Sequence, residues 1–240
     1  MTEMVSAIPV TISAIRQASP SVKLFTLGTG EDRLEFHSGQ WVDCYIDVDG
    51  EQLVGGYSLT SSPLVTGSVE LAVKQARQNT VTQYLHERTF VGDGLYLAGG
   101  QGGCYYTAGM ARSLFLIAGG IGITPLISIL RYVRQADPEV AITLLYSASS
   151  PEELIFRDEI ERLAAESDLV RCEFTVTHEV ERRRPGDGSS RIDANMLSAM
   201  AIDPAALCFL CGPSAMIDDL SRTLVALGVE QSRIRYEKWW

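Results

Sequence analysis

The fold is constrained most by a change of rhythm at Ser113, after which buried strands, glycine turns and helices alternate. Residues 114–118 form an uninterrupted apolar run, which is typical of a parallel strand covered on both faces. A helix is predicted at residues 125–135, with Thr124 at its N-cap and Pro125 in its first turn. Further strands are expected at residues 142–146, 172–177, 207–211 and 234–238, and further helices at 151–165, 193–200 and 214–227. This alternation predicts a doubly wound parallel sheet.

The N-terminal half consists instead of short, often alternating apolar segments. Strands are expected at residues 10–15, 22–27, 41–48, 69–74 and 94–98, separated by turn residues that include 99–103. This pattern is typical of a small antiparallel barrel or sandwich. A short helix is expected at residues 82–88, capped by Thr82. We therefore divide the chain into an N-terminal antiparallel β domain, residues 1–108, and a C-terminal α/β domain, residues 109–240.

Charge and hydropathy narrow the possible partners and the compartment. The net charge is −10, which disfavours nucleic acid, and the basic cluster Arg182-Arg183-Arg184 is interpreted as a solvated loop. No apolar run approaches the roughly 18 residues needed to span a bilayer, and the first ten residues lack the basic start of a signal peptide. The five scattered cysteines fit reduced thiols. We therefore expect a soluble, cytoplasmic protein.

Two glycine turns predict a nucleotide site. Gly119, Gly120 and Gly122 lie between a buried strand and a helix, where backbone N–H groups and the helix N-terminus attract a pyrophosphate. The usual third glycine is missing, so this turn alone could also serve tight packing. Gly212-Pro213 ends a second strand, before a helix capped by Ser214. Two such turns in one sheet predict a ligand crevice at the carboxyl ends of the strands.

The pair Cys208 and Cys211 is not interpreted as a metal or redox site. In a strand these positions point to opposite faces, with Cα atoms roughly 10 Å apart, beyond the roughly 7 Å limit for a disulfide. No second Cys or His pair has zinc spacing, so no metal is expected. We expect Cys208 in the core, while Cys211 can face the crevice. The chain also lacks a Gly-x-Ser-x-Gly elbow, so a hydrolase is not supported.

A third motif combines an aromatic residue, hydroxyls and a turn, and on its own it fits either a ligand site or a strand that ends in a Ser-Pro turn. It is Gly55-Gly56-Tyr57-Ser58-Leu59-Thr60-Ser61-Ser62-Pro63. Together with the other motifs it resembles the ferredoxin–NADP reductase superfamily over nearly the whole chain. The landmarks occur in that family's order, at residues 38–41, 57–63, 91–94, 119–125, 211–213 and 237–240. Within the superfamily the chain most resembles the oxidoreductase NAD-binding domain-containing proteins, which share the Gly-Gly-aromatic-Ser segment and the Glu-Lys-Trp-Trp ending.

The resemblance implies a flavin-binding type of barrel and a role for each motif. Tyr57 would pack on the flavin and Ser58 would hydrogen-bond near flavin N5, with Glu237 beside it. The remaining flavin-side residues would be Leu59, Thr60, Val73, Lys74, Thr80, Val81 and Thr82, the last three at the FAD pyrophosphate. Trp239 and Trp240 would cover the ring, as the resemblance implies, or would fill the interface between the two domains. Cys211 would lie near the nicotinamide. The residues implied to hold the pyridine nucleotide are Gly119, Gly120, Gly122, Ile123, Thr124, Pro125, Gly212, Pro213 and Met216.

One departure concerns the flavin phosphates. The family usually has an Arg two positions before the motif Tyr, and this chain has Gly55; it also has Asn79 where a Gly commonly opens the helix. Loss of a charged phosphate contact costs about 1.5–3 kcal/mol in a partly buried site. Lys74 or Arg77 could compensate. The resemblance thus implies FAD rather than FMN, bound with modest affinity.

Two functions stay open. The chain is either a flavoprotein reductase that passes electrons from NAD(P)H through FAD to a separate protein or small molecule, or a flavin-poor nucleotide-binding module that regulates a partner. NADH is expected to be favoured over NADPH, because residues 146–151 offer hydroxyls and no cation to a 2′-phosphate. Arg157 or the Arg182–Arg184 loop could still approach such a phosphate.

Overall fold

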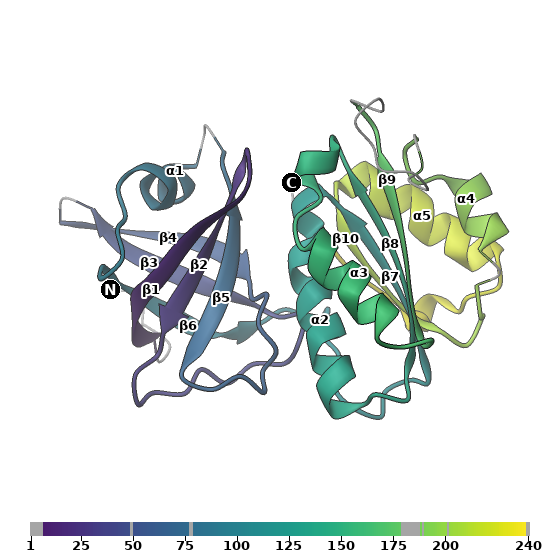
Figure 1. Ribbon diagram of the computed structural model, residues 1–240, viewed down its shortest axis with the longest axis horizontal. Coiled ribbons are helices and arrows are strands. Elements are labelled where there is room, and N and C mark those ends of the chain that lie inside the picture. The colour runs from purple at the N-terminus through teal and green to yellow at the C-terminus, as the bar shows by residue number, and fades with distance from the viewer. Residues whose placement is uncertain are drawn as a thin grey trace.

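The protein is built around two β-sheets, one from each half of the chain. The computed structural model describes residues 7–48, 50–76, 79–178, 188, 190–200 and 202–238. In Figure 1 the N-terminal sheet and the one helix described in that half lie on the left, and the C-terminal sheet and the remaining described helices lie on the right. Helix α2 lies on the face of the C-terminal sheet that is turned toward the N-terminal half (Figure 1).

The N-terminal sheet has six antiparallel strands in the order β4-β3-β6-β1-β2-β5. An antiparallel bridge between Leu59 and Leu71 brings the two edges together, so the sheet closes into a barrel. The barrel core contains Ile12, Phe25, Val42, Leu71 and Leu97. The elements are β1 (Ala7–Ser19), β2 (Val22–Gly28), β3 (Trp41–Val48), β4 (Glu51–Ser58), β5 (Ser68–Lys74), α1 (Thr80–Glu87) and β6 (Gly94–Gln101).

The C-terminal sheet has five parallel strands in the order β11-β10-β7-β8-β9. Its strands are β7 (Ser113–Gly119), β8 (Ala141–Ala148), β9 (Val170–Val176), β10 (Leu207–Gly212) and β11 (Ile234–Lys238). Its helices are α2 (Ile123–Ala136), α3 (Arg157–Ala165), α4 (Ala194–Ala199) and α5 (Ser214–Ala226), with short 3-10 turns at Gly120–Gly122, Pro151–Glu153 and Gln231–Arg233. The predicted fold class, a flavin-type barrel followed by a doubly wound sheet, is confirmed.

Both faces of the parallel sheet are covered, which explains why β7 is apolar from Leu114 to Ala118. Leu116 of β7 packs into the core that contains α2 and α3, whereas its neighbour Ile117 packs into the core that contains α4 and α5. Successive side chains of a strand point to opposite faces, so each residue of β7 has an apolar neighbour. No described helix has both the length and the apolarity of a membrane span.

The barrel and the parallel sheet share a hydrophobic interface. Val22, Leu24 and Ala72 of the barrel are buried in the same cluster as Ile127 and Leu130 of α2. Because burial of apolar surface is the main favourable term in folding, this seam holds the two halves together.

Several predicted boundaries need correction. Asn79, and not Thr82, caps α1, because its Oδ1 accepts the Thr82 N–H at 2.9 Å. The N-cap of α2 is Gly122, two residues before the predicted Thr124. The N-cap of α5 is Pro213, one residue before the predicted Ser214.

Two further predictions were wrong in extent. The helix expected at residues 151–165 is interrupted by Phe156, whose φ of 62° lies in the left-handed region, so α3 begins only at Arg157. The turn expected at residues 99–103 begins late, because β6 continues to Gln101. Its Gly100 packs so closely on the side chains of Gln40 and Phe36 that a Cβ there would lie 2.5 Å from Gln40 Oε1.

Candidate functional site

A cavity of about 640 Å³ opens at the carboxyl ends of the parallel strands. It lies where the strand order reverses, since the chain continues from β7 to β8 on one side and β10 lies on the other. Doubly wound folds bind their ligands at this point. Of the predicted nucleotide residues, those lining the cavity are Gly119, Gly120, Gly122, Gly212, Pro213 and Met216. Lys74 lines it from the barrel side.

The glycines are needed because the two turns touch through their backbones. A Cβ on Gly122 would lie 2.2 Å from the carbonyl oxygen of Cys211, and one on Gly212 would lie 3.1 Å from the Cα of Gly119. Met216 fills the remaining space, its Sδ 2.8 Å from the Cβ position of Gly119. The turns after β7 and β10 therefore pack directly against each other and form one surface. The N-terminus of α2 lies behind this surface.

The other predicted residues of this segment are buried beneath the turn and stabilise its conformation. Ile123, Thr124 and Pro125 are buried in the first turn of α2. Thr124 Oγ1 donates to the carbonyl oxygen of Ile121 at 2.9 Å, which fixes the turn. Cys211 is fully buried in the core on the α2 side, so the expectation that it can face the crevice is not met in this structure, while Cys208 lies in the opposite core as predicted.

The far wall of the cavity is formed where β8 ends, by Ser147 and Ser149. Arg157 does not line the cavity, and its side chain has partners elsewhere. Its Nε donates to Glu161 at 2.7 Å, and its guanidinium lies over the ring of Phe174 at 4.6 Å. With 7% of its side chain exposed, Arg157 does not turn toward the cavity.

On the barrel, the predicted motif places Tyr57 against α1. The Tyr57 hydroxyl lies 3.1 Å from Thr82 Oγ1, and burial raises the pKa of Tyr57 to about 12. The ring covers Gly55, because a Cβ at that position would lie 2.9 Å from Tyr57 Cε2 and 3.1 Å from Val81. Gly55 therefore makes room for the aromatic ring, which a longer side chain at position 55 would displace.

Ser58 points to the other side and leaves its hydroxyl unsatisfied. Among the described residues its Oγ is buried and has no hydrogen-bond partner, and the same holds for Oε2 of Glu237 on β11. Ser58 pairs with Trp41, and a Cβ on Gly102 would lie 2.8 Å from Trp41 Nε1 and 3.1 Å from Glu237 Oε1. The two halves of the chain thus bring a hydroxyl and a carboxylate to the same region. Burial raises the pKa of Glu237 to about 7.

The remaining predicted residues are placed as follows. Leu59 and Thr60 are fully buried after β4, Val73 is buried in the barrel core, and Thr80 begins α1. Outside the described residues lie Arg77, the cluster Arg182–Arg184, Trp239 and Trp240.

Several residues that line the cavity were not predicted from the sequence. Arg191 and Asp219 line the cavity from distant segments, as do Glu153 and Thr177. Asp219 could have been found from Met216, since residues three apart lie on one side of a helix. Glu153 also binds the barrel, because its Oε2 accepts from Ser19 and Ser21 at 3.1 and 2.6 Å.

Two family models match the chain, one in each half. Residues 9–106 match the oxidoreductase FAD-binding domain, and residues 116–222 match the oxidoreductase NAD-binding domain. The first match covers the barrel, and the second covers four of the five parallel strands.

Relatives match over most of their length. A protein of Danio rerio called oxidoreductase NAD-binding domain-containing protein 1 is 34% identical, and the match covers 92% of this chain and 88% of the relative. Its Homo sapiens counterpart is 34% identical over 99% of this chain and 81% of its own length. Ferredoxin–NADP reductase B of Sorangium cellulosum is 30% identical, with 94% and 95% covered.

Solved structures share the fold at lower identity. The FAD/NAD-binding domain of the nitric oxide dioxygenase of Vibrio cholerae superposes with a TM-score of 0.86 at 23% identity, over 97% of this chain and 98% of that domain. A ferredoxin NADP⁺ reductase of Neisseria gonorrhoeae, solved with FAD and NADP, gives 0.82 at 20% identity, over 98% and 99%.

Proposed function

Since this chain belongs to the ferredoxin–NADP reductase superfamily, among the oxidoreductase NAD-binding domain-containing proteins, we propose that it is a flavoprotein reductase that takes electrons from NADH. We divide it functionally into an FAD-binding part, residues 1–108, and an NAD-binding part, residues 109–240. The acceptor is proposed to be a separate electron-carrier protein or a small molecule.

Among the described residues three buried side-chain oxygens have no hydrogen-bond partner, one of them Ser221 Oγ on α5. The observation that carries the proposal is that the other two, Ser58 Oγ and Glu237 Oε2, come from the two halves of the chain and lie in the same region. A buried polar atom without a partner costs about 1–3 kcal/mol, so native proteins rarely retain one unless something else binds it. A flavin ring has polar atoms along its edge and an apolar face. It would satisfy these oxygens while Tyr57 packs on that face, so the residues present fit the group.

The other barrel residues would hold the remainder of FAD. Thr80, Val81 and Thr82 begin α1, whose N-terminus attracts phosphate; the Thr82 N–H is already bound to Asn79 Oδ1. Thr82 and Tyr57 would offer their hydroxyls to the pyrophosphate, and Lys74 at the end of β5 would supply a cation. Leu59, Thr60 and Val73 would support the ring from the core, and Trp239 and Trp240 would cover it.

On the other side of the seam, the glycine turns would bind the nucleotide. Gly119, Gly120, Gly122 and Gly212 leave the backbone open to a pyrophosphate, and Pro213 and Met216 would border the nicotinamide. Ile123, Thr124 and Pro125 would keep the turn rigid. When bound, FAD supplies the redox chemistry by accepting hydride from the nicotinamide and releasing electrons to the acceptor. Ser58 would orient the ring, and Cys211 would support the nicotinamide end of the site from beneath the turn.

Preference for NADH rests on the charges that line the cavity. Ser147 and Ser149 suit a ribose hydroxyl, and the carboxylates of Glu153 and Asp219 would repel a 2′-phosphate. Arg157 is held by Glu161 and Phe174, whereas Arg191 lines the cavity and would oppose this repulsion. Steady-state kinetics with both nucleotides test the preference. A higher kcat/KM with NADPH contradicts it.

The experiment that tests the function combines reconstitution with the S58A variant. Wild-type protein incubated with FAD should acquire a flavin spectrum that NADH bleaches without oxygen. S58A should fold with a free energy of unfolding within about 1 kcal/mol of wild type, because the hydroxyl has no partner to lose, yet its flavin should be reduced at least about tenfold more slowly.

A second function is favoured by one observation. Tyr57 already bonds Thr82 and covers Gly55, so position 55 offers no cation to the FAD phosphates. This arrangement suits a flavin-poor nucleotide-binding module that regulates a partner. If excess FAD gives neither a flavin spectrum nor thermal stabilisation, while NADH still binds, the module replaces the reductase.

A further inference from the structure

Helix α2 connects the two predicted cofactor sites. Its N-terminus follows the glycine turn directly, and one of its faces lies against the barrel segment just after Tyr57-Ser58. Ser128, Arg131 and Gln135 share this face, because their spacings of three and four residues correspond to successive helical turns. The partners on the barrel are the consecutive residues Thr60, Ser61 and Ser62.

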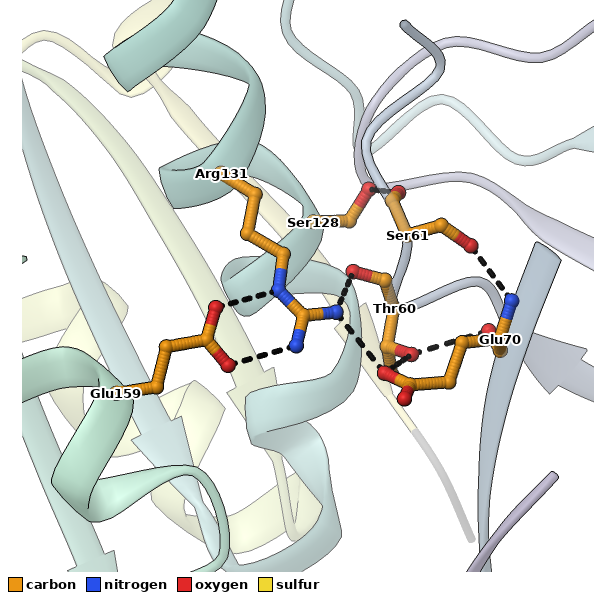
Figure 2. Close-up of polar contacts among 6 residues, drawn as sticks. All are labelled: Thr60, Ser61, Glu70, Ser128, Arg131 and Glu159. Atoms are coloured by element: carbon orange, nitrogen blue, oxygen red, sulfur yellow. Dashed lines mark hydrogen bonds and ion pairs between the residues drawn. The ribbon is translucent and has the colours of Figure 1, made fainter. Parts of the chain in front are cut away.

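Three hydrogen bonds tie this face to the segment. Ser128 Oγ donates to the carbonyl oxygen of Ser61 at 2.6 Å, and Ser62 Oγ donates to Gln135 Oε1 at 2.8 Å. Between them, Arg131 Nη1 donates to the carbonyl oxygen of Thr60 at 2.8 Å. Figure 2 shows the central part of this contact, where Arg131 and Ser128 point from α2 into the barrel segment.

Arg131 extends the contact to two more elements. Its Nη1 also lies 2.9 Å from Glu70 of β5, whereas its Nε and Nη2 bind both oxygens of Glu159 on α3, each at 2.7 Å (Figure 2). Burial opposes the charge of Arg131, but the contacts with Glu159 and Glu70 outweigh it and raise the pKa of Arg131. One guanidinium therefore joins the barrel, α2 and α3.

The environment holds the guanidinium in this position. Phe156 lies under it at 5.1 Å and has the one left-handed φ, 62°, among the described non-glycine residues. Such a conformation is costly for a bulky residue and persists only where its surroundings enforce it. On the barrel side, Thr60 Oγ1 donates to Glu70 Oε1 at 2.7 Å, which orients the carboxylate toward Arg131.

The contacts of Arg131 fix the position of α2 relative to the barrel more than they add to the free energy of unfolding. Partly buried ion pairs contribute little net free energy, since desolvation offsets their attraction. The apolar seam around Leu24 and Ile127 supplies adhesion, but hydrophobic contact has no direction and tolerates sliding. The planar guanidinium of Arg131, whose three partners are themselves held in place, can make all its hydrogen bonds in one arrangement only.

We infer that Arg131 is a positioning residue that holds the nucleotide turn at residues 119–122 at a fixed distance from the flavin strand at residues 57–58. The inference rests on the proposed function, because it assigns Arg131 the task of setting how closely the nicotinamide approaches the flavin. Misplacement of the reacting groups by about 1 Å can cost about 100-fold in rate, so the contacts of Arg131 act on the rate of flavin reduction.

The test compares R131M and R131K with R134M, which removes an arginine of the same helix whose Nη1 bonds only locally, to Pro138. In R131M we expect at least about tenfold slower flavin reduction at saturating NADH and a weaker charge-transfer band, with a smaller change in the NADH Kd. R131K should recover melting temperature more than rate, because lysine keeps the charge without the fork. R134M should match wild type.

A measurement without cofactors separates this inference from the proposed function. Hydrogen exchange in cofactor-free protein should become faster in R131M both at residues 59–62 and at residues 119–124, and stay unchanged in R134M. If wild-type protein is not reduced by NADH, the proposed function fails and exchange alone decides the inference. Wild-type reduction and charge transfer in R131M, or unchanged exchange at residues 119–124, overturn it. If R131M does not fold, E70A is judged by the same criteria; it removes the Glu70 carboxylate from Arg131 and Thr60 and leaves the bonds of Arg131 to Glu159 and to the Thr60 carbonyl oxygen.

Discussion

Glu237 is the residue with the most consequential electrostatics. It lies on the last strand, near Trp41 of the barrel, and its Oε2 has no partner among the described residues. Burial raises its pKa from 4.5 to about 7, because the charged form loses hydration without gaining a counter-charge. Near neutral pH this carboxyl changes charge readily at the seam where the flavin is proposed to bind.

We predict that E237Q stabilises the cofactor-free protein in a pH-dependent way. Because the folded state has the raised pKa, the contribution of Glu237 to stability is fully present below pH about 4.5 and is lost as pH rises through about 7. Glutamine carries no charge, so the variant should melt above wild type at about pH 8 and near it at about pH 5. Thermal melts across this range check the sign. A constant offset at every pH would show that Glu237 does not titrate as described.

At the scale of elements, the turn between β7 and α2 is defined by a backbone contact. Gly122 has an ordinary helical φ of −61°, so its requirement for glycine is not conformational. It arises because the end of β10 passes so close that no Cβ fits, with Cys211 O at 2.2 Å. The position of the nucleotide turn relative to its neighbour therefore depends on one missing methyl group.

We expect Gly122→Ala to lower the free energy of unfolding by about 1–3 kcal/mol. The added Cβ would clash with backbone atoms, and a change of rotamer cannot relieve such a clash. The variant should also lose stabilisation by NAD⁺, because the two turns would move apart. Gly103→Ala is the matched control, as a Cβ there meets nothing within 4 Å. Chemical denaturation with and without NAD⁺ measures both effects. Equal behaviour of the two variants would refute the close-contact explanation.

At the scale of the molecule, the barrel and the parallel sheet form one packed body. Val22, Leu24 and Ala72 share a core with α2, and Glu153 receives hydrogen bonds from Ser19 and Ser21 at another part of the seam. Because unfolding either half exposes this interface, the two halves should lose structure together.

We predict a single melting transition, which FAD raises more than FMN does. A ligand that binds only the folded state at 100 times its Kd stabilises by about 2.7 kcal/mol, which corresponds to roughly 5–10 °C for a chain of this size. FMN lacks the second phosphate and the adenosine that the start of α1 is proposed to hold, so its shift should be smaller. Differential scanning calorimetry with matched ligand concentrations decides. Equal shifts would argue against the FAD assignment.

Local pattern was sufficient for most elements and for the fold class. Period-two segments predicted five of the six barrel strands, whereas β4 was considered only as one of two interpretations of residues 55–63. The unbroken apolar run of β7 indicated a strand covered on both faces. The strands at residues 41–48 and 234–238 lie where they were predicted. The two glycine turns located the nucleotide crevice, because strand ends in a parallel sheet meet at one edge. These features depend on residues close in sequence, which periodicity and turn chemistry describe directly.

Contacts between distant segments were decided only by the tertiary structure. Nothing near Arg131 in the chain indicates that it joins Thr60, Glu70 and Glu159. The proximity of Ser58 and Glu237 was implied by the family resemblance, and no local pattern around either residue indicates it. The left-handed Phe156 and the burial of Cys211 likewise follow from what packs around them. Side-chain partners across a seam are fixed by how two cores dock. Docking depends on the summed shape of both surfaces, which no single stretch of sequence encodes.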